Sequence, residues 1–536
     1  MLNLVELEKL VTDLMEKAKV PGASVAIVHK GKLMYARGFG VTSIEDGGMP
    51  VTPGTIFRIG STSKPLTSTA IMRLVASKHL ELDTSIDEIM PDFELSVPGA
   101  VKEVTLRKLL SHTAALPTAA EHYGARQAEG LRQSVYTDVT GYPLVAPVGK
   151  IWSYSNPGIN LAGYIAELVS GKTYAEMMQE LVFDPLDMKR TTFDPTIAMT
   201  YPIAQSHKLT PDGQLQVDHH YADNVMHYPS GFVMSTVLDL ANFAIMHVSG
   251  GRFGDQQILS PEAVEEMHTP YARFESFDDS GYGLTFSSYN YKGVRVVGHG
   301  GRISSFASSF EFVPQTGTAV IILANNSALW GKCETTITEF VLDGLLELPA
   351  EVPALTFIDP DRSLWDRYVG LYVGANSGAA EITREDGVLV LQFQGQKLLL
   401  NTVRPDLYTA QMPDGQYMPV SFMLEGEAPA KYINLMIQSG YMLTLERLDV
   451  DPNFKVDVRQ LGQYVGVYEN SLDKMTVLLE GDQLFVSSPL FQSANFPMRP
   501  VAAGRFVFLA GLLTFETPDS MLLGGSLRFN RVPSAK

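Results

Sequence analysis

Cysteine is almost absent from this sequence, with Cys333 the single one among 536 residues. One thiol cannot close a disulfide within the chain or build a cysteine cage around a metal, which excludes a small disulfide scaffold and a zinc ribbon. Long apolar runs are also missing. The run at 506–515 has ten residues, about half the length that a bilayer crossing needs. We therefore expect no membrane-spanning helix.

Basic residues are scarce relative to acidic ones. The chain has 41 Lys and Arg against 59 Asp and Glu, a net charge of −18. Such a surface repels phosphate backbones and anionic lipid, so neither nucleic acid nor a membrane is expected as a partner. The first residues lack the basic segment of a signal peptide, which predicts a cytoplasmic protein by default, or a periplasmic or secreted one if a signal was removed. A small-molecule substrate is the expected partner, and a homo-oligomer stays open.

The hydrophobic pattern of the first 345 or so residues begins and ends in strands. A helical stripe at 4–19 precedes a predicted hairpin at 23–28 and 33–36, and helical patterns dominate from 64 to 243. Strand patterns then return at 282–286, 293–297, 309–313 and 319–323. This order predicts an α+β fold, with an antiparallel sheet closed from both termini around a helical lobe.

Beyond residue 346 the sequence is rich in short strands and contains an internal repeat. Tyr368-Val369-Gly370-Leu371-Tyr372 returns 96 residues later as Tyr464-Val465-Gly466-Val467-Tyr468, and two further matches recur at an offset of 95. Two related all-β modules, each an antiparallel barrel, are the prediction. The expected domains are a first one over 1–348, a first barrel module over 355–449 and a second over 455–536.

A nucleophile motif lies where a glycine joins a short apolar stretch to a long helix. Ser61 and Lys64 are three residues apart, so they share one face of a helix that Ser61 opens, with the amine near the hydroxyl. The N-terminus of that helix presents backbone N–H groups where an oxyanion would form. Alone the motif is weak, because Ser471 and Lys474 have the same spacing.

Two further motifs carry polar groups on turns. Tyr154 and Asn156 supply a phenol that can take a proton and an amide that can hold a carbonyl group. His299, Gly300 and Gly301 follow a predicted strand, and the glycines let a backbone edge approach a substrate. Each motif has other matches in the chain, at 432–434 and 468–470 for the first and at 29–31 for the second.

The three motifs together, in this order, resemble those of the penicillin-recognising serine hydrolases: S-x-x-K, then Y-x-N or S-x-N, then K-T-G or a variant. The stretches 109–117, 230–240 and 317–325 look like the same family, so the resemblance covers nearly all of residues 5–345. It implies a β-lactamase-like fold for the first domain. Two departures are Ala115, where the family often has glycine, and the histidine of the third motif.

The resemblance also implies roles for the site residues. Ser61 would be the nucleophile, with Lys64 and Tyr154 handling its proton. Asn156 would bind a substrate carbonyl, His299 would replace the lysine of the third motif, and the backbone N–H groups of Ser61 and Arg302, beside Gly301, would form the oxyanion hole. A histidine, largely neutral at pH 7, weakens the case for a β-lactamase or a carboxypeptidase, whose substrates carry a carboxylate.

The layout with two barrels is similar to that of bacterial D-stereospecific aminopeptidases, in which a loop of the last barrel shapes the pocket. It predicts a serine hydrolase that cleaves a small amide or peptide through an acyl-enzyme, without cofactor or metal. The alternatives are a family VIII-type carboxylesterase or acyltransferase, a weak β-lactamase, and a peptide-binding or assembly protein without turnover. The spacing of His219, His220 and His227 forms no evident metal-ligand set and instead predicts a lid or surface loop near the pocket.

Overall fold

The computed structural model describes residues 2–118, 125–210, 212–221, 223–329, 331–350, 354–374, 378–413, 415–438, 441–451, 454, 456–470, 473–488, 495–525 and 527–533. Its first part is built on one antiparallel sheet in the order β2-β1-β14-β13-β12-β11-β10-β9. The strands are β1 Gly22–His29, β2 Lys32–Gly40, β9 Ala272–Arg273, β10 Gly281–Tyr282, β11 Ser287–Tyr291, β12 Val294–Ile303, β13 Phe306–Val313 and β14 Thr318–Ala324. Because β1 pairs with β14, the sheet is closed from both ends of this region, as predicted.

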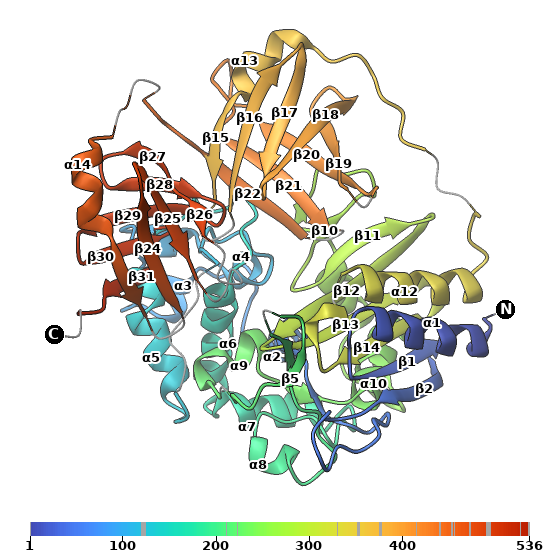
Figure 1. Cartoon of the computed structure of the whole chain (residues 1–536). Helices are drawn as coiled ribbons and strands as arrows, with labels where there is room; N and C mark the ends of the chain where they lie inside the picture. Colours follow the sequence, from blue (N-terminus) through green and yellow to red (C-terminus); the bar gives the residue numbers. More distant parts are fainter. Residues whose placement is uncertain are drawn as a thin grey trace.

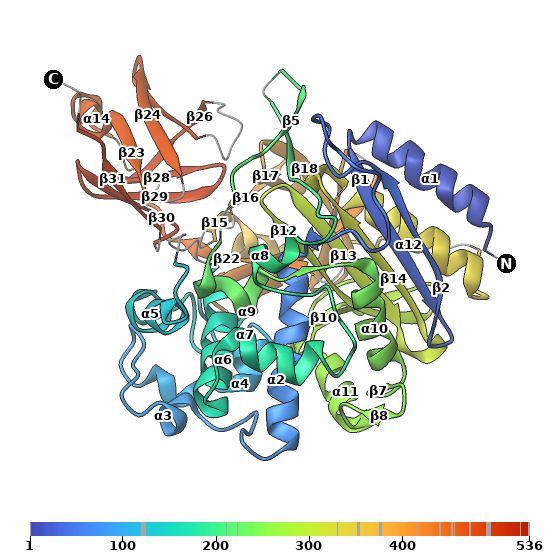
Figure 2. The ribbon, with the colours of Figure 1, turned by 90° about the horizontal axis from the view of Figure 1, so that it is seen from below.

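Both faces of this sheet are covered, which explains the unbroken burial of β1. Val25 and Ile27 pack on the face that α1 and α12 cover. Ala26 and Val28 point to the other face, into the large core shared with the helical lobe. Figures 1 and 2 show α1 and α12 side by side on the outer face of the sheet and α10 on the inner face. The chain therefore forms a three-layered structure here.

Short helices and small ribbons complete this region. The helices are α1 Leu4–Lys17, α2 Ser63–Ala76, α3 Ile86–Ile89, α4 Leu106–Leu110, α5 Gly130–Thr137, α6 Asn156–Ser170, α7 Tyr174–Met178, α8 Pro195–Ala198, α9 Tyr228–Gly231, α10 Val237–Val248, α11 Pro261–His268 and α12 Lys332–Leu345. The ribbons pair β3 Phe57–Arg58 with β6 Met234–Ser235, β4 His207–Leu209 with β5 Leu215–Val217, and β7 Arg252–Phe253 with β8 Gln256–Gln257.

One predicted strand is wrong in extent. The pattern at 282–286 predicts five strand residues, but β10 ends at Tyr282. Thr285 adopts a φ of 67°, and the Gly283 N–H donates to the carbonyl oxygen of Phe286 across a turn. Leu284 and Phe286 are nevertheless buried in the core, so their apolar character reflects core packing rather than strand pairing.

The repeat forms two all-β units. The first is a closed barrel of β15 Gly370–Val373, β16 Ala379–Glu385, β17 Val388–Phe393, β18 Gln396–Arg404, β19 Leu407–Gln411, β20 Tyr417–Met423, β21 Tyr432–Gln438 and β22 Tyr441–Leu448, preceded by α13 Trp365–Tyr368. The second, which we call the second sheet, follows α14 Val458–Leu461 and has nine strands, β23 Gly466–Glu469, β24 Lys474–Glu480, β25 Gln483–Ser487, β26 Phe496–Pro497, β27 Arg499–Ala502, β28 Arg505–Phe508, β29 Gly511–Thr517, β30 Ser520–Leu523 and β31 Leu527–Arg531. It curls into a nearly closed barrel, with β26 and β27 at its two edges.

The repeated tyrosine motif makes the same contact in both units. The Tyr372 hydroxyl donates to the Tyr368 carbonyl oxygen at 2.7 Å, and the Tyr468 hydroxyl donates to the Tyr464 carbonyl oxygen at 2.9 Å. In Figure 1 the first barrel lies above the N-terminal region and the second sheet lies beside it.

Candidate active site

Ser61 and Lys64 lie at the start of the central helix α2. Ser61 is in a short 3₁₀ turn, Gly60–Thr62, that leads into α2, so it precedes the α-helix rather than opening it. Gly60 has a φ of 53°, a conformation that favours glycine, and a Cβ at this position would lie 2.7 Å from the backbone nitrogen of Arg302. Glycine thus lets the Ser61 turn rest against the backbone of β12.

Lys64 is fully buried and its ammonium group has three polar acceptors. The Nζ atom donates to Ser61 Oγ at 2.9 Å, to Asn156 Oδ1 at 2.8 Å and to the Ser230 carbonyl oxygen at 2.6 Å. An ammonium has three protons, and a buried charge is tolerated only when it is so compensated. Three separated segments of the chain therefore meet at Lys64.

Tyr154 precedes α6 and lies over the same amine. Lys64 Nζ is 4.8 Å from the centre of the Tyr154 ring. Burial raises the pKa of Tyr154, a shift that its hydrogen bond with Ser61 partly offsets. The resting side chain is therefore a neutral phenol next to the serine hydroxyl. Asn156 is the first residue of α6, which Ser155 caps by accepting from the Gly158 N–H at 3.0 Å.

The third predicted motif lies on β12, directly beside the Ser61 turn. A Cβ on Gly301 would lie 2.0 Å from the Ile59 carbonyl oxygen and 2.9 Å from the Ser61 nitrogen. The Thr62 hydroxyl contacts the His299 carbonyl oxygen at 3.2 Å and Ser308 Oγ at 2.8 Å. The backbone nitrogens of Ser61 and Arg302 thus lie in adjoining segments that pack tightly, whereas the Arg302 side chain is exposed.

His299 is a buried, neutral histidine. Its Nε2 lies 3.0 Å from the Tyr282 hydroxyl and its Nδ1 lies 2.5 Å from the Gly300 carbonyl oxygen. Burial and the Lys64 charge lower the pKa of His299 to about 3. A neutral imidazole gives no positive charge for a substrate carboxylate, in agreement with the inference from the sequence.

Sequence reasoning missed an aromatic cluster behind Tyr154. The His112 ring lies 4.5 Å from that of Tyr154 and 5.0 Å from that of Tyr282, measured between ring centres. Burial and the Lys64 charge hold the pKa of His112 well below its usual range, and its Nδ1 accepts the Ser155 N–H at 3.1 Å. The signal for His112 was its place in the stretch 109–117 that resembles the family.

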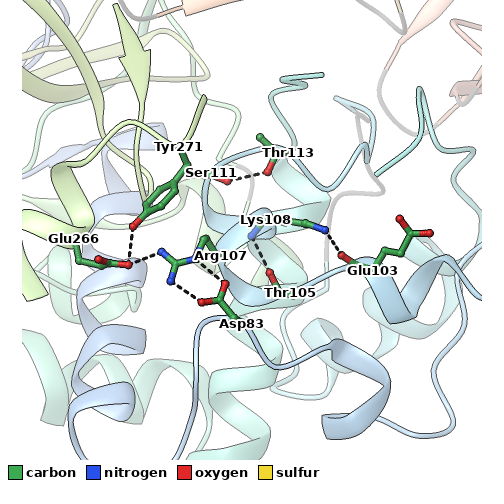
Figure 3. Close-up of polar contacts among 9 residues, drawn as sticks. All are labelled: Asp83, Glu103, Thr105, Arg107, Lys108, Ser111, Thr113, Glu266 and Tyr271. Atoms are coloured by element: carbon green, nitrogen blue, oxygen red, sulfur yellow. Dashed lines mark hydrogen bonds and ion pairs between the residues drawn. The ribbon is translucent and has the colours of Figure 1, made fainter. Parts of the chain in front are cut away.

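A polar network anchors α4, which ends two residues before His112 (Figure 3). Arg107 on α4 donates two hydrogen bonds of 2.7 Å to the Asp83 carboxylate and pairs with Glu266 on α11. The Tyr271 hydroxyl donates to the same Glu266 at 2.6 Å, and its ring lies 4.6 Å from the guanidinium carbon. This network holds α4 in place. It therefore also positions His112, which follows α4 in the chain and packs against Tyr154.

The first barrel supplies a residue that sequence reasoning did not select. The Tyr441 ring on β22 lies 5.5 Å from the ring centres of both Trp152 and Tyr154, and burial raises the pKa of Tyr441 to about 12. The resemblance had led us to expect a loop of the last module at the pocket. Among the described residues, the barrel side chain that packs on Tyr154 comes from the first module, while Gly524 and Gly525 of the last module line the same cavity as Tyr154.

The competing motif matches lie elsewhere. Tyr432 and Asn434 are on β21 of the first barrel, Tyr468 is on β23, and His29 ends β1, where its ring lies 3.0 Å from the Thr318 hydroxyl. Ser471 falls outside the described residues, and Lys474 begins β24.

The three histidines of the 219–227 segment do not converge. His219 is exposed and pairs with Glu45 at 3.0 Å, whereas the buried His227 contacts Asn160 at 2.8 Å. In the described part of the chain, no group of three His, Cys, Asp or Glu side chains is arranged to hold a metal ion. Nor does that part contain a helix both long and apolar enough to span a membrane.

The model of the beta-lactamase family matches residues 7–334, more than half of the chain. The chain belongs to this family. As a member of the β-lactamase and penicillin-binding-protein superfamily, it shares a fold whose members are generally serine hydrolases. A curated relative, penicillin-binding protein 4 of Amycolatopsis lactamdurans, is 28% identical over 342 residues, 62% of this chain and 86% of the relative. The unguisins hydrolase ungD of Aspergillus violaceofuscus is 23% identical, with 65% of each chain covered, so this family member spans less than two thirds of that hydrolase.

Solved structures extend the similarity beyond the family match. The octameric penicillin-binding protein homologue from Pyrococcus abyssi aligns with 82% of this beta-lactamase-family chain and 100% of its own, at a TM-score of 0.57 and 25% identity. SurE solved with D-Leu aligns with 83% of this chain and 99% of its own, at a TM-score of 0.63 and 22% identity. Both alignments cover more of this chain than the family match does, so the similarity of fold includes part of the all-β region.

Proposed function

We propose that this protein is a serine hydrolase that cleaves small amides or peptides through an acyl-enzyme on Ser61, with D-aminopeptidase-like specificity. The observation that carries the proposal is the 2.9 Å contact of the Lys64 ammonium with Ser61 Oγ, combined with the hydrogen bond between Ser61 and Tyr154. A weak nucleophile is thus bonded to two groups that can manage its proton, the requirement for an activated serine.

In the proposed acylation, Ser61 Oγ attacks the substrate carbonyl carbon while its proton passes to the Lys64 and Tyr154 pair. The resting pair is the Lys64 ammonium and the Tyr154 phenol, so it can accept this proton only after Lys64 has lost one proton and become a neutral amine. Tyr154 receives the Ser61 proton as it passes its own phenolic proton to the neutral Lys64 amine, and both transfers reverse to protonate the leaving nitrogen as the C–N bond breaks. A water molecule then attacks the ester carbonyl and releases Ser61.

The remaining residues bind and polarise the substrate. The backbone N–H groups of Ser61 and Arg302 stabilise the oxyanion, and Asn156 orients the substrate carbonyl next to Lys64. The neutral His299 disfavours substrates that need a cation at the third motif, such as β-lactams. SurE, which was solved with D-Leu, supports a substrate with a D-residue, and the unguisins hydrolase among the relatives supports a hydrolytic reaction.

The experiment that tests this function measures adduct formation and turnover separately. Incubation with a fluorophosphonate, followed by intact-protein mass spectrometry, should give one adduct in the wild type and in Ser471→Ala, the serine of the competing motif, and none in Ser61→Ala. Values of kcat/KM on D-alanyl p-nitroanilide, p-nitrophenyl butyrate and nitrocefin then rank the substrates. The hydrolase proposal fails if wild type forms no adduct, and turnover of the ester alone would replace the amidase assignment by an esterase.

A further inference from the structure

A cavity of about 290 Å³ lies between the candidate site and both β units. Trp152 and Tyr154 line it from the N-terminal region, and Tyr441 lines it from the first barrel. Arg505 and Leu512 line it from the second sheet. All three parts of the chain are therefore needed to form this one cavity, which the proposed chemistry at Ser61 leaves unassigned.

The cavity extends along strand β22. Residues 441–444 and 446–448 all line it, so its wall follows the strand from the first residue to the last. At about 3.4 Å per residue, this is a path of roughly 24 Å. An extended peptide has the same rise, so the shape suits a linear chain of several residues. The Thr444 hydroxyl holds the strand in place by donating to the Trp152 carbonyl oxygen at 3.1 Å.

The position of Tyr154 decides which part of a substrate enters the cavity, and this step rests on the proposed function. A group that accepts the Ser61 proton returns it to the leaving nitrogen, which must therefore lie beside Tyr154 while the acyl carbon is at Ser61. Tyr154 is in the cavity wall, next to Tyr441. The leaving side of the substrate thus extends from Tyr154 along β22, while the acyl side stays at Ser61.

The charges along the wall indicate what the end of the leaving group carries. Arg447 donates to the Arg367 carbonyl oxygen and contacts the Tyr372 hydroxyl, each at 3.3 Å, and Glu446 lies 3.8 Å from Lys431. Arg505 is half-buried, and among the described residues its side chain makes no hydrogen bond or ion pair. In a chain with 59 acidic residues, a partly buried guanidinium without a carboxylate is suited to accept one from a ligand.

We propose that this cavity is the leaving-group subsite for peptides of several residues, and that Arg505 binds their C-terminal carboxylate. The apolar walls at Trp152, Tyr441 and Leu512 contact the intervening side chains. The substrate class is thereby narrowed from small amides to linear peptides with a free carboxyl end, from which the enzyme removes the residue bound at Ser61. The first barrel and the second sheet act as specificity elements.

The test uses substrates with one acyl residue and different leaving groups: a p-nitroanilide, a dipeptide, a tetrapeptide acid and the same tetrapeptide as its C-terminal amide. In the wild type, kcat/KM should rise with peptide length and favour the acid over the amide about tenfold, as for a charge-assisted pair. Arg505→Gln should abolish the preference for the acid and leave the p-nitroanilide rate unchanged. Arg505→Lys should keep part of the preference for the acid.

The matched control is Arg499→Gln, since Arg499 belongs to the same sheet but pairs with Glu381 at 2.7 Å and lies outside this cavity. It should leave the acid preference intact. The subsite proposal is overturned if p-nitroanilide is hydrolysed but peptide length and carboxylate make no difference, or if Arg505→Gln lowers all rates equally. Calorimetric measurement of tetrapeptide acid and amide binding to Ser61→Ala tests the subsite proposal without turnover. Equal affinities for the two peptides overturn the subsite proposal even if the hydrolase proposal has failed.

Discussion

Sharing its proton with Asn434 Oδ1 at 2.9 Å, the Thr444 hydroxyl of the first barrel donates to the Trp152 carbonyl oxygen at 3.1 Å, two residues before Tyr154. This bond ties the barrel to the segment that carries the proposed proton-transfer group. Since Lys150 also pairs with Glu425 at 2.6 Å, the same segment is held to the barrel at two points. We infer that the barrel positions Tyr154 as well as lining the cavity.

Thr444→Val should therefore lower kcat severalfold and the free energy of unfolding by about 1 kcal/mol, because it leaves the Trp152 carbonyl without its donor. The control is Thr409→Val, whose buried hydroxyl donates to the Met418 carbonyl oxygen at 3.2 Å within the barrel. It should lower stability similarly and leave kcat unchanged. Steady-state kinetics measure kcat, and urea unfolding measures the free energy of unfolding, for each variant. Equal kcat values for Thr444→Val and Thr409→Val would contradict a positioning role of Thr444.

Tyr154→Phe tests the proton path. It keeps the ring that packs on His112 and Tyr441 but removes the hydroxyl, so kcat should fall by about 10² to 10⁴ with little change in folding. Tyr174→Phe is the matched control, because it removes another buried phenol, which is bonded to Thr67 at 2.7 Å and not to Ser61. That variant should lose about 1 kcal/mol of stability and keep its kcat. Near wild-type turnover by Tyr154→Phe would assign the base to Lys64 alone.

Gly301→Ala tests the packing of β12 against the Ser61 turn. The added Cβ would meet the Ile59 carbonyl oxygen at 2.0 Å and the Ser61 nitrogen at 2.9 Å, so these backbones must separate. We expect kcat/KM to fall by 10² or more, since displaced oxyanion donors lose most of their effect. Gly141→Ala, where no atom lies within 4 Å of the added Cβ, is the control and should be silent. Unchanged kinetics in Gly301→Ala would show that the turn absorbs the methyl group.

Some parts of the site and of the fold could be predicted from the sequence. Ser61 and Lys64 were predictable as neighbours because a three-residue spacing brings two side chains together across the 3₁₀ turn that leads into α2. The meeting with Tyr154 and β12 followed from the order of motifs that resembles a known family. The antiparallel sheet was predictable from strand patterns at both ends of the N-terminal region, and the two barrels from a repeat whose tyrosines make the same hydrogen bond twice.

Tyr441 and His112 were not predictable in the same way. Tyr441 is 380 residues from Ser61 in the chain, in a strand whose local pattern only indicates a barrel, and its contact with Tyr154 depends on how the barrel docks. His112 reaches the site through α4, which is held by contacts with Asp83 and Glu266 that no local pattern encodes. Docking between distant elements is decided by packing and not by periodicity.

The buried histidine pair of the core makes stability depend on pH. His268 Nε2 lies 3.1 Å from His247 Nδ1, and the His247 ring packs against Phe243, Phe286 and Phe312. Burial lowers the pKa of His247 to about 3, against roughly 6.5 in the unfolded chain. Between these values the unfolded state binds the extra proton, so the stabilising contribution of neutral His247 is complete above pH 6.5 and is lost as the pH falls toward 3.

His247→Gln should consequently reduce the slope of unfolding free energy against pH between 6.5 and 5 by about 1.1 kcal/mol per unit on average. The comparison must be with wild type, because burial raises the pKa of Glu311 to about 7 and that carboxyl group contributes with the opposite sign in both proteins. His219→Gln, which changes an exposed histidine, is the control and should keep the wild-type slope. Urea unfolding at half-unit steps of pH measures all three proteins. If the slope of His247→Gln equals that of His219→Gln, the core histidine is not the group that titrates on unfolding.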